Sequence, residues 1–457
     1  MRIAIVGGGL SGTTTCLQLL RAGIPDLRIT LIERRSRQMN RGVAYSAQLT
    51  QQLLNVPAGR MGLFPDDVGA FHRWSCSGPS PTAKAADFLP RRQFGDFVQE
   101  QFHEAIDAHP GQVTMERSEA IGVERFPGGP YRLLLARGAS VDADRVVLAL
   151  GNAPPEHVPN MTEDAKLHPA YIAWPWKHGA LGTIEPHEHV VFVGSGLTMV
   201  DLVLSLKDQG HTGPVTVISR RGFFPRPHVQ APHWEFMQPE PDVANATVLD
   251  LLRWVKAEVD IARSADVPWQ SVFDAVRHRV QAWWQAMPSF ERKTFLRHLR
   301  PFWEVHRHRM PATVHDRLTA LQREGRFRVL AARVRGVIRT DAGLVLTYTP
   351  RGTEDIWKLD RGYVINCTGP QAESRRADQP LVQELLAHGL VAWDDLHMGF
   401  RCTPEGAVVD AQGRVSEHLY AIGPMCKATL WECTAVPEIR EQVARLVRMI
   451  GPERVGA

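Results

Sequence analysis

Short apolar runs and glycine-rich turns alternate at the N-terminus. Residues 2–6 predict a buried strand, and the four glycines among residues 7–12 predict a tight turn. Residues 13–22 predict a helix that ends at Gly23, and residues 27–32 predict a second strand. Together they form a strand–helix–strand unit of about 30 residues, which is typical of a parallel sheet.

A second unit of this kind begins at residue 189. It has a strand, a glycine-containing turn, a helix and a further strand, predicted at residues 190–193, 194–199, 200–207 and 215–219. Between the two units, proline-rich loops are expected over residues 40–100. A helix and hairpin-like strands are predicted at residues 94–108, 113–116, 120–126, 131–136 and 144–150.

A region of different texture follows the second unit. Residues 246–310 have helical periodicity without a strand pattern, and they hold five of the twelve tryptophans. Apolar residues at helical spacing run from Phe273 to Met287, so we expect a helical insertion here. Further strands are predicted at residues 327–338, 344–349, 362–366 and 419–422, and a final helix at 435–450.

The composition is that of a folded globular chain. Hydrophobic residues make up 44% and charged residues 22% of the 457 residues. The net charge of +4 is too small to indicate a nucleic-acid partner. No apolar stretch reaches the roughly 18 residues of a membrane span, and the N-terminus has no secretory pattern. We therefore expect a cytoplasmic protein without a nucleic-acid or membrane partner.

The six cysteines form neither a C-x-x-C pair nor a set with zinc-ligand spacing. A dithiol oxidoreductase of the thioredoxin type needs two close thiols, so this class is disfavoured. No metal site is expected. The lack of a disulfide framework in the sequence pattern indicates a reducing compartment.

The first turn has the pattern Gly7-x-Gly9-x-x-Gly12 between the predicted strand and helix. Gly7 permits the tight turn, Gly9 lets a pyrophosphate approach the backbone, and Gly12 lets the helix pack close to the strand. The helix N-terminus faces the phosphate charge. Glu33, which lies 21 positions after Gly12, can accept hydrogen bonds from a ribose. The combination predicts a dinucleotide site, and a chance glycine-rich turn is the alternative interpretation.

The second turn repeats the pattern as Gly194-x-Gly196-x-x-Met199. Met199 replaces the third glycine, so this helix must lie further from its strand. In place of an acidic residue, the next strand is followed by Ser219, Arg220 and Arg221. A hydroxyl and two guanidinium groups suit the 2′-phosphate of NADPH, which we expect in preference to NADH. A solvated arginine pair is the alternative.

Two dinucleotide patterns in one chain indicate two nucleotide cofactors. We expect FAD to be held by the first unit and NADPH or NADH to bind transiently to the second. The predicted fold is α/β, with two Rossmann-like dinucleotide-binding domains and a helical insertion. Residues 1–185 and 362–457 are assigned to the FAD-binding domain, 186–245 and 311–361 to the NAD(P)-binding domain, and 246–310 to the insertion.

Stretches along nearly the whole chain resemble the flavoproteins with two dinucleotide-binding domains. Within them, the chain is similar to a bacterial FAD–NAD(P)-binding family that is distantly similar to N-hydroxylating and Baeyer–Villiger monooxygenases. The resemblance rests on residues 7–12 with Glu33, 41–46, 54–58, 71–74, 90–95, 148–152, 194–201, 366–369, 420–424 and 431–437. It implies cofactor contacts from Ser11, Arg41, Tyr45, Asn55, Arg91, Gly151, Gly369, Gly423 and Thr434.

The C-terminal helix is expected to serve the flavin. Many such flavoproteins have an acidic residue at the position of Pro424 that bonds the ribityl chain, so Gly423 and the following helix would take over this role. Thr434 can cap the helix and Pro437 suits its first turn. The positive end of the helix dipole would stabilise the reduced, anionic flavin. An ordinary packed terminal helix is the alternative.

The insertion ends in a basic and aromatic segment. Residues 277–309 hold eight Lys or Arg against two Glu. We expect an anion-recognition wall over the flavin, for a ligand such as urate or an amino-acid carboxylate. The expected substrate-binding residues are Trp303, His306, Arg307 and Arg309. A solvated basic helix face is the alternative.

The sequence therefore predicts an FAD-dependent NAD(P)H monooxygenase. NAD(P)H would reduce FAD, and O2 would be used to hydroxylate a small polar nitrogenous substrate. Urate is the first candidate, because urate hydroxylation is an activity expected within the resembled family. The alternatives are an N-hydroxylase of an amino acid or polyamine, an NAD(P)H reductase without oxygenation, and a non-catalytic redox-sensing flavoprotein. No catalytic acid or base and no oligomeric state is assigned.

Overall fold

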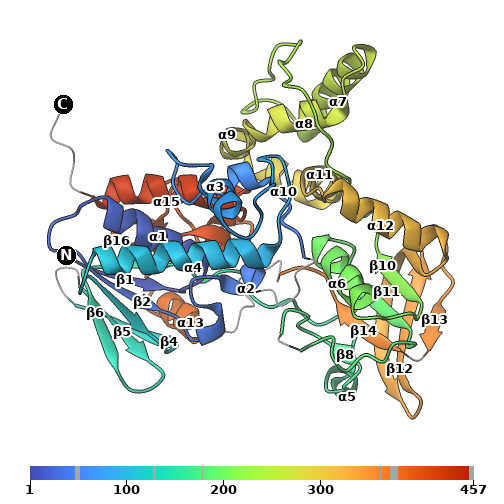
Figure 1. Ribbon diagram of the computed structural model, residues 1–457, viewed down its shortest axis with the longest axis horizontal. Coiled ribbons are helices and arrows are strands. Elements are labelled where there is room, and N and C mark those ends of the chain that lie inside the picture. Colours follow the sequence, from blue (N-terminus) through green and yellow to red (C-terminus); the bar gives the residue numbers. More distant parts are fainter. Residues whose placement is uncertain (47–51, 127–129, 178, 361, 371–378, 452–457) are drawn as a thin grey trace.

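The computed structural model describes residues 1–46, 52–126, 130–177, 179–360, 362–370 and 379–451. Two sheet-containing domains lie side by side, and a lobe of helices stands out from the junction between them (Figure 1). The first domain holds a six-stranded sheet and the second domain a seven-stranded sheet. The helical lobe comprises α7 to α11. Within the described residues, no helix is both long and apolar enough to cross a membrane.

The first domain is built from both ends of the chain. Its N-terminal elements are β1 (Arg2–Val6), α1 (Leu10–Arg21), β2 (Arg28–Ile32), η1 (Ser36–Gln38), α2 (Gly42–Tyr45), η2 (Ala58–Arg60), α3 (Ala70–Ser77), α4 (Arg91–Ala108), β3 (Val113–Glu116), β4 (Ala120–Arg125), β5 (Tyr131–Leu135), β6 (Ser140–Ala143) and β7 (Arg145–Leu148). Its C-terminal elements are α13 (Pro380–Ala387), β15 (Ala407–Val409), β16 (Val415–Ala421), η4 (Gly423–Cys426), α14 (Lys427–Leu430) and α15 (Val436–Ile450).

The sheet of the first domain has the strand order β15-β16-β7-β1-β2-β3. β1 pairs in parallel with β2 and β7. Its side chains alternate between two cores. Ile3 and Ile5 pack with α1, α4 and α15, whereas Ala4 and Val6 pack with α13 and the three-stranded sheet β4-β5-β6. Burial on both faces explains why this strand is an uninterrupted apolar run in the sequence.

The second domain repeats this plan. Its elements are α5 (Glu163–Lys166), β8 (Tyr171–Ile172), β9 (Val190–Val193), α6 (Leu197–Asp208), β10 (Val215–Ser219), α12 (Ala312–Arg323), β11 (Phe327–Thr340), β12 (Gly343–Pro350), β13 (Trp357–Asp360) and β14 (Tyr363–Asn366). The strand order is β13-β12-β11-β10-β9-β14-β8, and β9 pairs in parallel with β10 and β14. Val190 and Phe192 of β9 pack with α6 and α12, and Val191 and Val193 pack with β11 and β12.

The lobe has a core of its own. Its helices are α7 (Val248–Ser264), α8 (Trp269–Arg277), α9 (Val280–Ala286), α10 (Ser289–His298) and α11 (Arg300–Arg307). Trp254, Trp283 and Trp284 are buried between them. The fully buried Glu258 accepts the indole N–H of Trp234 at 2.9 Å, which ties the segment before α7 to the lobe. The region predicted as helical is therefore helical.

The predicted run of hairpin-like strands is wrong in part. β4, β5 and β6 are antiparallel neighbours, but β3 pairs in parallel with β2, and β7 pairs in parallel with β1. The long helix α4 lies between β2 and β3 and returns the chain to the same end of the sheet. A helical crossover of this kind produces a parallel neighbour instead of a hairpin.

The predicted domain boundaries also need correction. β8 and β14 belong to the seven-stranded sheet, although residues 171–172 and 363–366 lie in the predicted FAD-binding domain. β14 pairs directly with β9, so it completes the second domain before the chain returns to the first. The apolar helical face predicted from Phe273 to Met287 is divided between α8 and α9, because the helix is interrupted at residues 278–279.

Candidate functional site

Both glycine-rich turns have the same backbone conformation. Gly7 and Gly194 have φ values of 106° and 105°, in the region that favours glycine. Gly9 and Gly196 are the N-cap residues of α1 and α6, with φ values of −76° and −78°. The second turn therefore folds like the first, although it lacks the third glycine of the pattern.

Close backbone contacts explain the glycines of the first turn. A Cβ atom on Gly7 would overlap the carbonyl oxygen of Ala149, and one on Gly12 would overlap the carbonyl oxygen of Gly7. A Cβ atom on Gly9 would lie 3.2 Å from the Cα atom of Gly42. The first N–H groups of α1 have no acceptor within the helix, so a pyrophosphate at this end can accept hydrogen bonds from them.

Glu33 follows β2 and closes the first turn. Its carboxylate accepts the backbone N–H of Gly8 at 2.9 Å and that of Arg35 at 2.9 Å. A carboxylate has about four acceptor positions, so two remain for ribose hydroxyls. The predicted role of Glu33 is compatible with this geometry.

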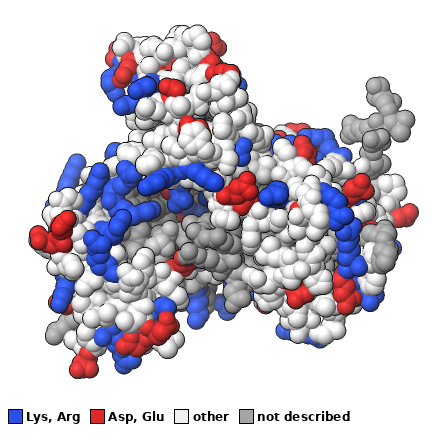
Figure 2. Space-filling view, turned by 180° about the vertical axis from the view of Figure 1, so that it is seen from behind, with Lys and Arg blue, Asp and Glu red and all other residues white. Residues whose placement is uncertain are grey.

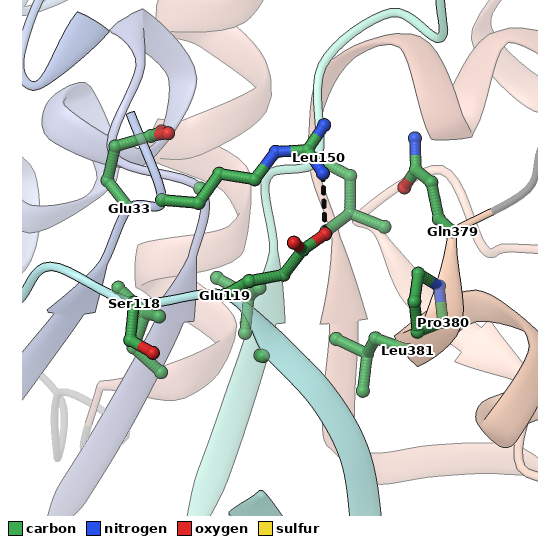
Figure 3. A pocket seen from close by; sticks show the side chains of 12 residues that line it. Glu33, Ser118, Glu119, Leu150, Gln379, Pro380 and Leu381 are labelled. Atoms are coloured by element: carbon green, nitrogen blue, oxygen red, sulfur yellow. Dashed lines mark hydrogen bonds and ion pairs between the residues drawn. The ribbon is translucent and has the colours of Figure 1, made fainter. Parts of the chain in front are cut away.

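A pocket that is open to solvent lies beside Glu33 (Figure 3). The ends of β1 and β2, residues 118–120, Leu150 and residues 379–381 line it. Figure 3 also shows the ion pair of Arg34 with Glu119, at 2.5 Å, within this lining. The cavity lies at the carboxyl ends of the central strands, where doubly wound sheets bind dinucleotides. It suits the adenosine half of FAD.

The second turn has the equivalent close contact. A Cβ atom on Gly194 would overlap the carbonyl oxygen of Cys367, which follows β14 as Ala149 follows β7 in the first domain. Gly151 and Gly369 come two residues after these carbonyls and have φ values of 71° and 88°. The structure thus places Gly151 beside the first turn and Gly369 beside the second. A contact of Gly369 with a nucleotide at the second turn stays a prediction.

The end of β10 presents the residues predicted for a 2′-phosphate. The Ser219 hydroxyl oxygen accepts the N–H of Gly222 at 3.1 Å, while Arg220 is exposed and Arg221 is half-buried. No atom lies within 4 Å of a Cβ built on Gly196, so a phosphate can approach the turn. Lys and Arg side chains gather over the second domain beside the lobe (Figure 2). Binding of NADPH by these residues stays a prediction.

Gly423 brings the C-terminal part of the chain to the first turn. Its φ is 78°, and a Cβ there would lie 3.1 Å from the hydroxyl oxygen of Ser11. Its N–H donates to Gln442 Oε1 at 3.0 Å, and the buried Gln442 Nε2 has no partner among the described residues. The glycine turn and the cavity beside Glu33 form a cradle that fits the pyrophosphate and adenosine parts of FAD.

Two predicted FAD ligands, Arg41 and Tyr45, are engaged by α4. The guanidinium group of Arg41 donates to Asp96 at 2.5 Å and to Gln99 at 2.5 Å. The ring of Tyr45 meets the ring of Phe94 edge-on, with centroids 4.7 Å apart. These contacts hold the segment after the first turn against α4. A direct contact of either residue with FAD stays a prediction.

Asn55 and Arg91 lie where the two domains meet. The carbonyl oxygen of Asn55 is 3.1 Å from Nε2 of His228. Burial, with a smaller effect from the charge of Arg309, lowers the pKa of His228 to about 4, so this imidazole is neutral at pH 7. Arg91 forms an ion pair with Asp201 of α6 at 3.0 Å. Both predicted FAD ligands therefore contact the second domain.

The predicted cap of the last helix is wrong. The N-cap residue of α15 is Ala435, no side chain caps the helix, and Thr434 is exposed. Trp431 stacks on Trp284 of the lobe at 4.9 Å and has a positive φ of 45°. The turn that this packing imposes leaves Thr434 one residue too early to cap. Pro437 lies in the first turn of the helix, as predicted.

A set of buried charges joins the lobe to the first domain. Arg307 lies 3.2 Å from Glu432 and 3.1 Å from Glu438, and Arg277 lies 2.5 Å from Glu438. The indole of Trp303 donates to Glu432 at 2.9 Å. We call these five residues the buried charge cluster. Burial alone raises the pKa of Glu432, but the positive charges led by Arg307 lower it to about 2, so the carboxylate is ionised.

The other predicted substrate residues lie beside this cluster. The ring of His306 stacks on Phe273 with centroids 5.2 Å apart. Arg309 is 5% exposed and pairs with Asp274, and its Nε and Nη1 have no partner among the described residues. The four predicted side chains therefore gather at one end of the lobe. Arg307 is compensated by carboxylates, whereas Arg309 keeps unpaired N–H groups. Their contact with a substrate stays a prediction.

The carboxylates Glu432, Glu438 and Asp201 were not among the residues predicted from the sequence. Glu432 and Asp201 lie within stretches that carry the family resemblance, and this was the available signal. Their partners are more than 100 positions away, so no local spacing could reveal the pairs.

Comparisons with known proteins agree with this architecture. Residues 4–153 match a family model described as FAD-NAD(P)-binding. A comparison with curated protein sequences gives no match. An ornithine N-hydroxylase from Kutzneria sp. 744 has a TM-score of 0.65 and 15% identity, with 98% of each chain covered.

Two further solved structures are similar over nearly the whole chain. L-lysine 6-monooxygenase from Pseudomonas syringae has a TM-score of 0.68 and 14% identity, with 97% of each chain covered. A cadaverine monooxygenase from Erwinia amylovora has a TM-score of 0.68 and 12% identity, and it covers 100% of this chain and 95% of that one. At such identities the similarity establishes the fold. The chain thus has the fold of the flavoproteins with two dinucleotide-binding domains, and its residues 4–153 match an FAD-NAD(P)-binding family model.

Proposed function

We propose that this chain is an FAD- and NADPH-dependent monooxygenase that N-hydroxylates a primary amine of an amino acid or polyamine. The observation that carries the proposal is the helical lobe, which packs on both dinucleotide-binding domains where they meet. The similar solved structures are an ornithine N-hydroxylase, a lysine monooxygenase and a cadaverine monooxygenase. Their substrates all have a primary amine on a flexible aliphatic chain.

The lobe contacts both domains directly. On the first domain, the indole of Trp284 donates to the carbonyl oxygen of Ala428 at 2.6 Å. On the second domain, the backbone N–H of Arg226 donates to the carbonyl oxygen of Val305 at 3.0 Å. A cover at this junction would keep bulk water away from the flavin while O2 is being activated there. A monooxygenase needs this protection, and a reductase that passes electrons to a bulky acceptor does not.

Each part of the chain has a role in this proposal. FAD, when bound, supplies hydride acceptance from NADPH and the activation of O2. The N-terminus of α1 binds the pyrophosphate of FAD, and Glu33 binds its adenine ribose. The turn at Gly194 holds the pyrophosphate of NADPH, and the end of β10 holds its 2′-phosphate. The buried charge cluster fixes the lobe in place.

The alternatives receive less support. No comparison supports urate as the substrate, and the N-hydroxylase alternative fits the similar structures better. A disulfide reductase needs reactive thiols, but five of the six cysteines are buried. Burial raises the pKa of Cys16 to about 12 and also raises that of Cys367. A purely redox-sensing protein would not need two nucleotide sites and a cover.

The test is a coupling measurement on the purified, FAD-loaded protein. NADPH oxidation, O2 consumption and peroxide release are followed with L-ornithine, L-lysine, cadaverine or urate, and the product is examined for a hydroxylamine. The proposal expects one of the amines to accelerate NADPH oxidation, suppress peroxide release and yield a hydroxylamine. Coupling with urate instead would favour the first sequence-based candidate. Coupling with no small molecule would favour a reductase.

The nucleotide preference is tested separately. A charge-assisted phosphate contact contributes about 1.5–3 kcal/mol, or roughly ten- to a hundredfold in selectivity. The wild type should therefore reduce its flavin with NADPH at lower nucleotide concentrations than with NADH. The Arg220→Ala, Arg221→Ala double variant should lose this preference and keep its activity with NADH. A wild type that prefers NADH would contradict the 2′-phosphate site.

A further inference from the structure

A phenylalanine of the lobe lies on an arginine of the second dinucleotide site. The ring of Phe302, on α11, is 4.7 Å from the guanidinium carbon of Arg221. The same ring is 5.3 Å from the ring of Phe223. Phe302 is 39% exposed, so the contact is at the surface and open to a ligand on one side. A cation over an aromatic face is attracted by the ring quadrupole, which restricts the guanidinium group to the space above the ring.

The contact of Phe302 with Arg221 lies at the same edge of the sheet as the second glycine turn. β9 and β10 are parallel neighbours, so Gly194, which follows β9, and Ser219, which ends β10, lie at the same edge of the sheet. The hydroxyl of Ser195, in the turn, donates to the carbonyl oxygen of Phe223. The turn, the segment after β10 and the lobe are therefore joined through consecutive contacts at Ser195, Phe223 and Phe302.

No carboxylate pairs with Arg221 among the described residues, in contrast to the arginines gathered near the C-terminal end of α11. Arg277, Arg307 and Arg309 each pair with a carboxylate. Among the described residues, Arg220 and Arg221 form no ion pair. An aromatic ring orients a guanidinium group without neutralising it, so Arg221 remains available to an anion.

α11 is fixed by contacts with both domains. Its Trp303 donates to Glu432 at 2.9 Å, and its Val305 carbonyl accepts the N–H of Arg226 at 3.0 Å. The position of the Phe302 ring is therefore set by the docking of the lobe on both domains.

We propose that Phe302 is a positioning residue that holds Arg221 where it binds the 2′-phosphate of NADPH. The inference rests on the proposed function, because it concerns the proposed NADPH site. It gives the lobe a second role: besides covering the junction, the lobe contributes to the choice between NADPH and NADH. The nucleotide preference then depends on the lobe being docked.

The experiment measures binding of adenosine 2′,5′-bisphosphate to the FAD-loaded protein by calorimetry, and the NADPH-to-NADH ratio of flavin reduction. Phe302→Leu keeps an apolar side chain without a ring and should weaken binding by about two- to fivefold. Phe302→Tyr keeps the ring and should bind as the wild type does. Phe290→Leu, in the same lobe and 67% exposed, is the matched control and should change nothing. Retained FAD and an unchanged circular dichroism spectrum show that each variant is folded.

A double-mutant cycle separates the two proposals. Arg221→Ala should lower affinity for the bisphosphate by about tenfold, and adding Phe302→Leu to it should have no further effect. If Arg221→Ala leaves binding unchanged, the proposed 2′-phosphate site fails. If Arg221→Ala weakens binding but Phe302→Leu does not, the inference about Phe302 alone is overturned. Tighter binding of the bisphosphate by Phe302→Leu would mean that the ring keeps Arg221 away from the ligand. That result would also overturn the inference about Phe302.

Discussion

The guanidinium group of Arg91 lies 3.0 Å from the carboxylate of Asp201, and this ion pair joins the first domain to the second. The side chains are 12% and 9% exposed. Gln52 donates to the hydroxyl of Ser205 at 3.1 Å across the same junction. Burial raises the pKa of Asp201, and the charge of Arg91 opposes this shift. The relative position of the two nucleotide sites therefore depends on a buried pair that neither domain can satisfy alone.

Removing the Asp201 charge should loosen the junction. Asp201→Asn leaves the Arg91 charge buried, and we expect the free energy of unfolding to fall by about 3 kcal/mol. Flavin reduction by NADPH should also slow, because the two sites lose their fixed geometry. Urea unfolding and stopped-flow flavin reduction measure the two effects. Asp208→Asn, at the end of the same helix in an exposed pair with Arg317, should cost less than about 1 kcal/mol. If Asp201→Asn and Asp208→Asn changed stability and flavin reduction equally, the Arg91–Asp201 pair would not be what fixes the junction.

The glycines of the first turn should be required for flavin retention. Gly9→Val places a branched side chain against Gly42 and in the path of the pyrophosphate, and Gly12→Ala forces a Cβ into the carbonyl oxygen of Gly7. Both variants should purify without FAD, as measured by the absorbance ratio at 450 and 280 nm. Gly78→Ala is the control, because its Cβ would be 3.7 Å from the nearest atom. Full FAD occupancy in Gly9→Val would refute the pyrophosphate site.

Glu432 should make the protein sensitive to acid. Its folded pKa of about 2 is below the ordinary value of 4.5, so its stabilisation is complete above about pH 4.5 and is lost as the pH falls towards 2. Between pH 6 and pH 3, the free energy of unfolding of the wild type should fall by about 2 kcal/mol more than that of Glu432→Gln. Urea unfolding at both pH values measures this difference. Glu405→Gln, at an exposed position, is the control, and its free energy of unfolding should fall by as much as that of the wild type. Identical losses in Glu432→Gln and wild type would show that Glu432 is not the titrating group.

The lobe should be able to unfold while the rest of the protein stays folded. Glu258 accepts hydrogen bonds from Trp234, from the backbone N–H of Met237 and from that of Gln238 at 2.8 Å. Glu258→Ala leaves these buried donors unpaired, at a cost of about 1–3 kcal/mol for each. Hydrogen exchange over residues 234–264 should accelerate while FAD stays bound. Glu235→Ala, at an exposed neighbouring position, should not change it. Loss of FAD in Glu258→Ala would mean that the lobe and the first domain unfold together.

The two dinucleotide turns and their strands were predictable because their signals are local. The positive φ at Gly7 and Gly194 and the close approaches at Gly12 demand glycine at fixed positions in a short segment. The strands β1 and β9 are buried on both faces, so each is a continuous apolar run. Helical periodicity likewise identified the lobe, since apolar residues at helical spacing, such as Val276, Val280 and Trp284, line its interior.

The tertiary structure decided the partners of the charged residues and the placement of short elements. Arg307 lies between Glu432 and Glu438, which follow it by more than 120 positions in the chain, and no local pattern predicted these two partners. Threonine is a common cap residue, yet the N-cap of α15 is Ala435 and not Thr434. The stacking of Trp431 on Trp284 sets where this helix begins. An ion pair or a stacked ring depends on distances that only the folded chain defines. Backbone conformation and burial, in contrast, leave their pattern in neighbouring residues.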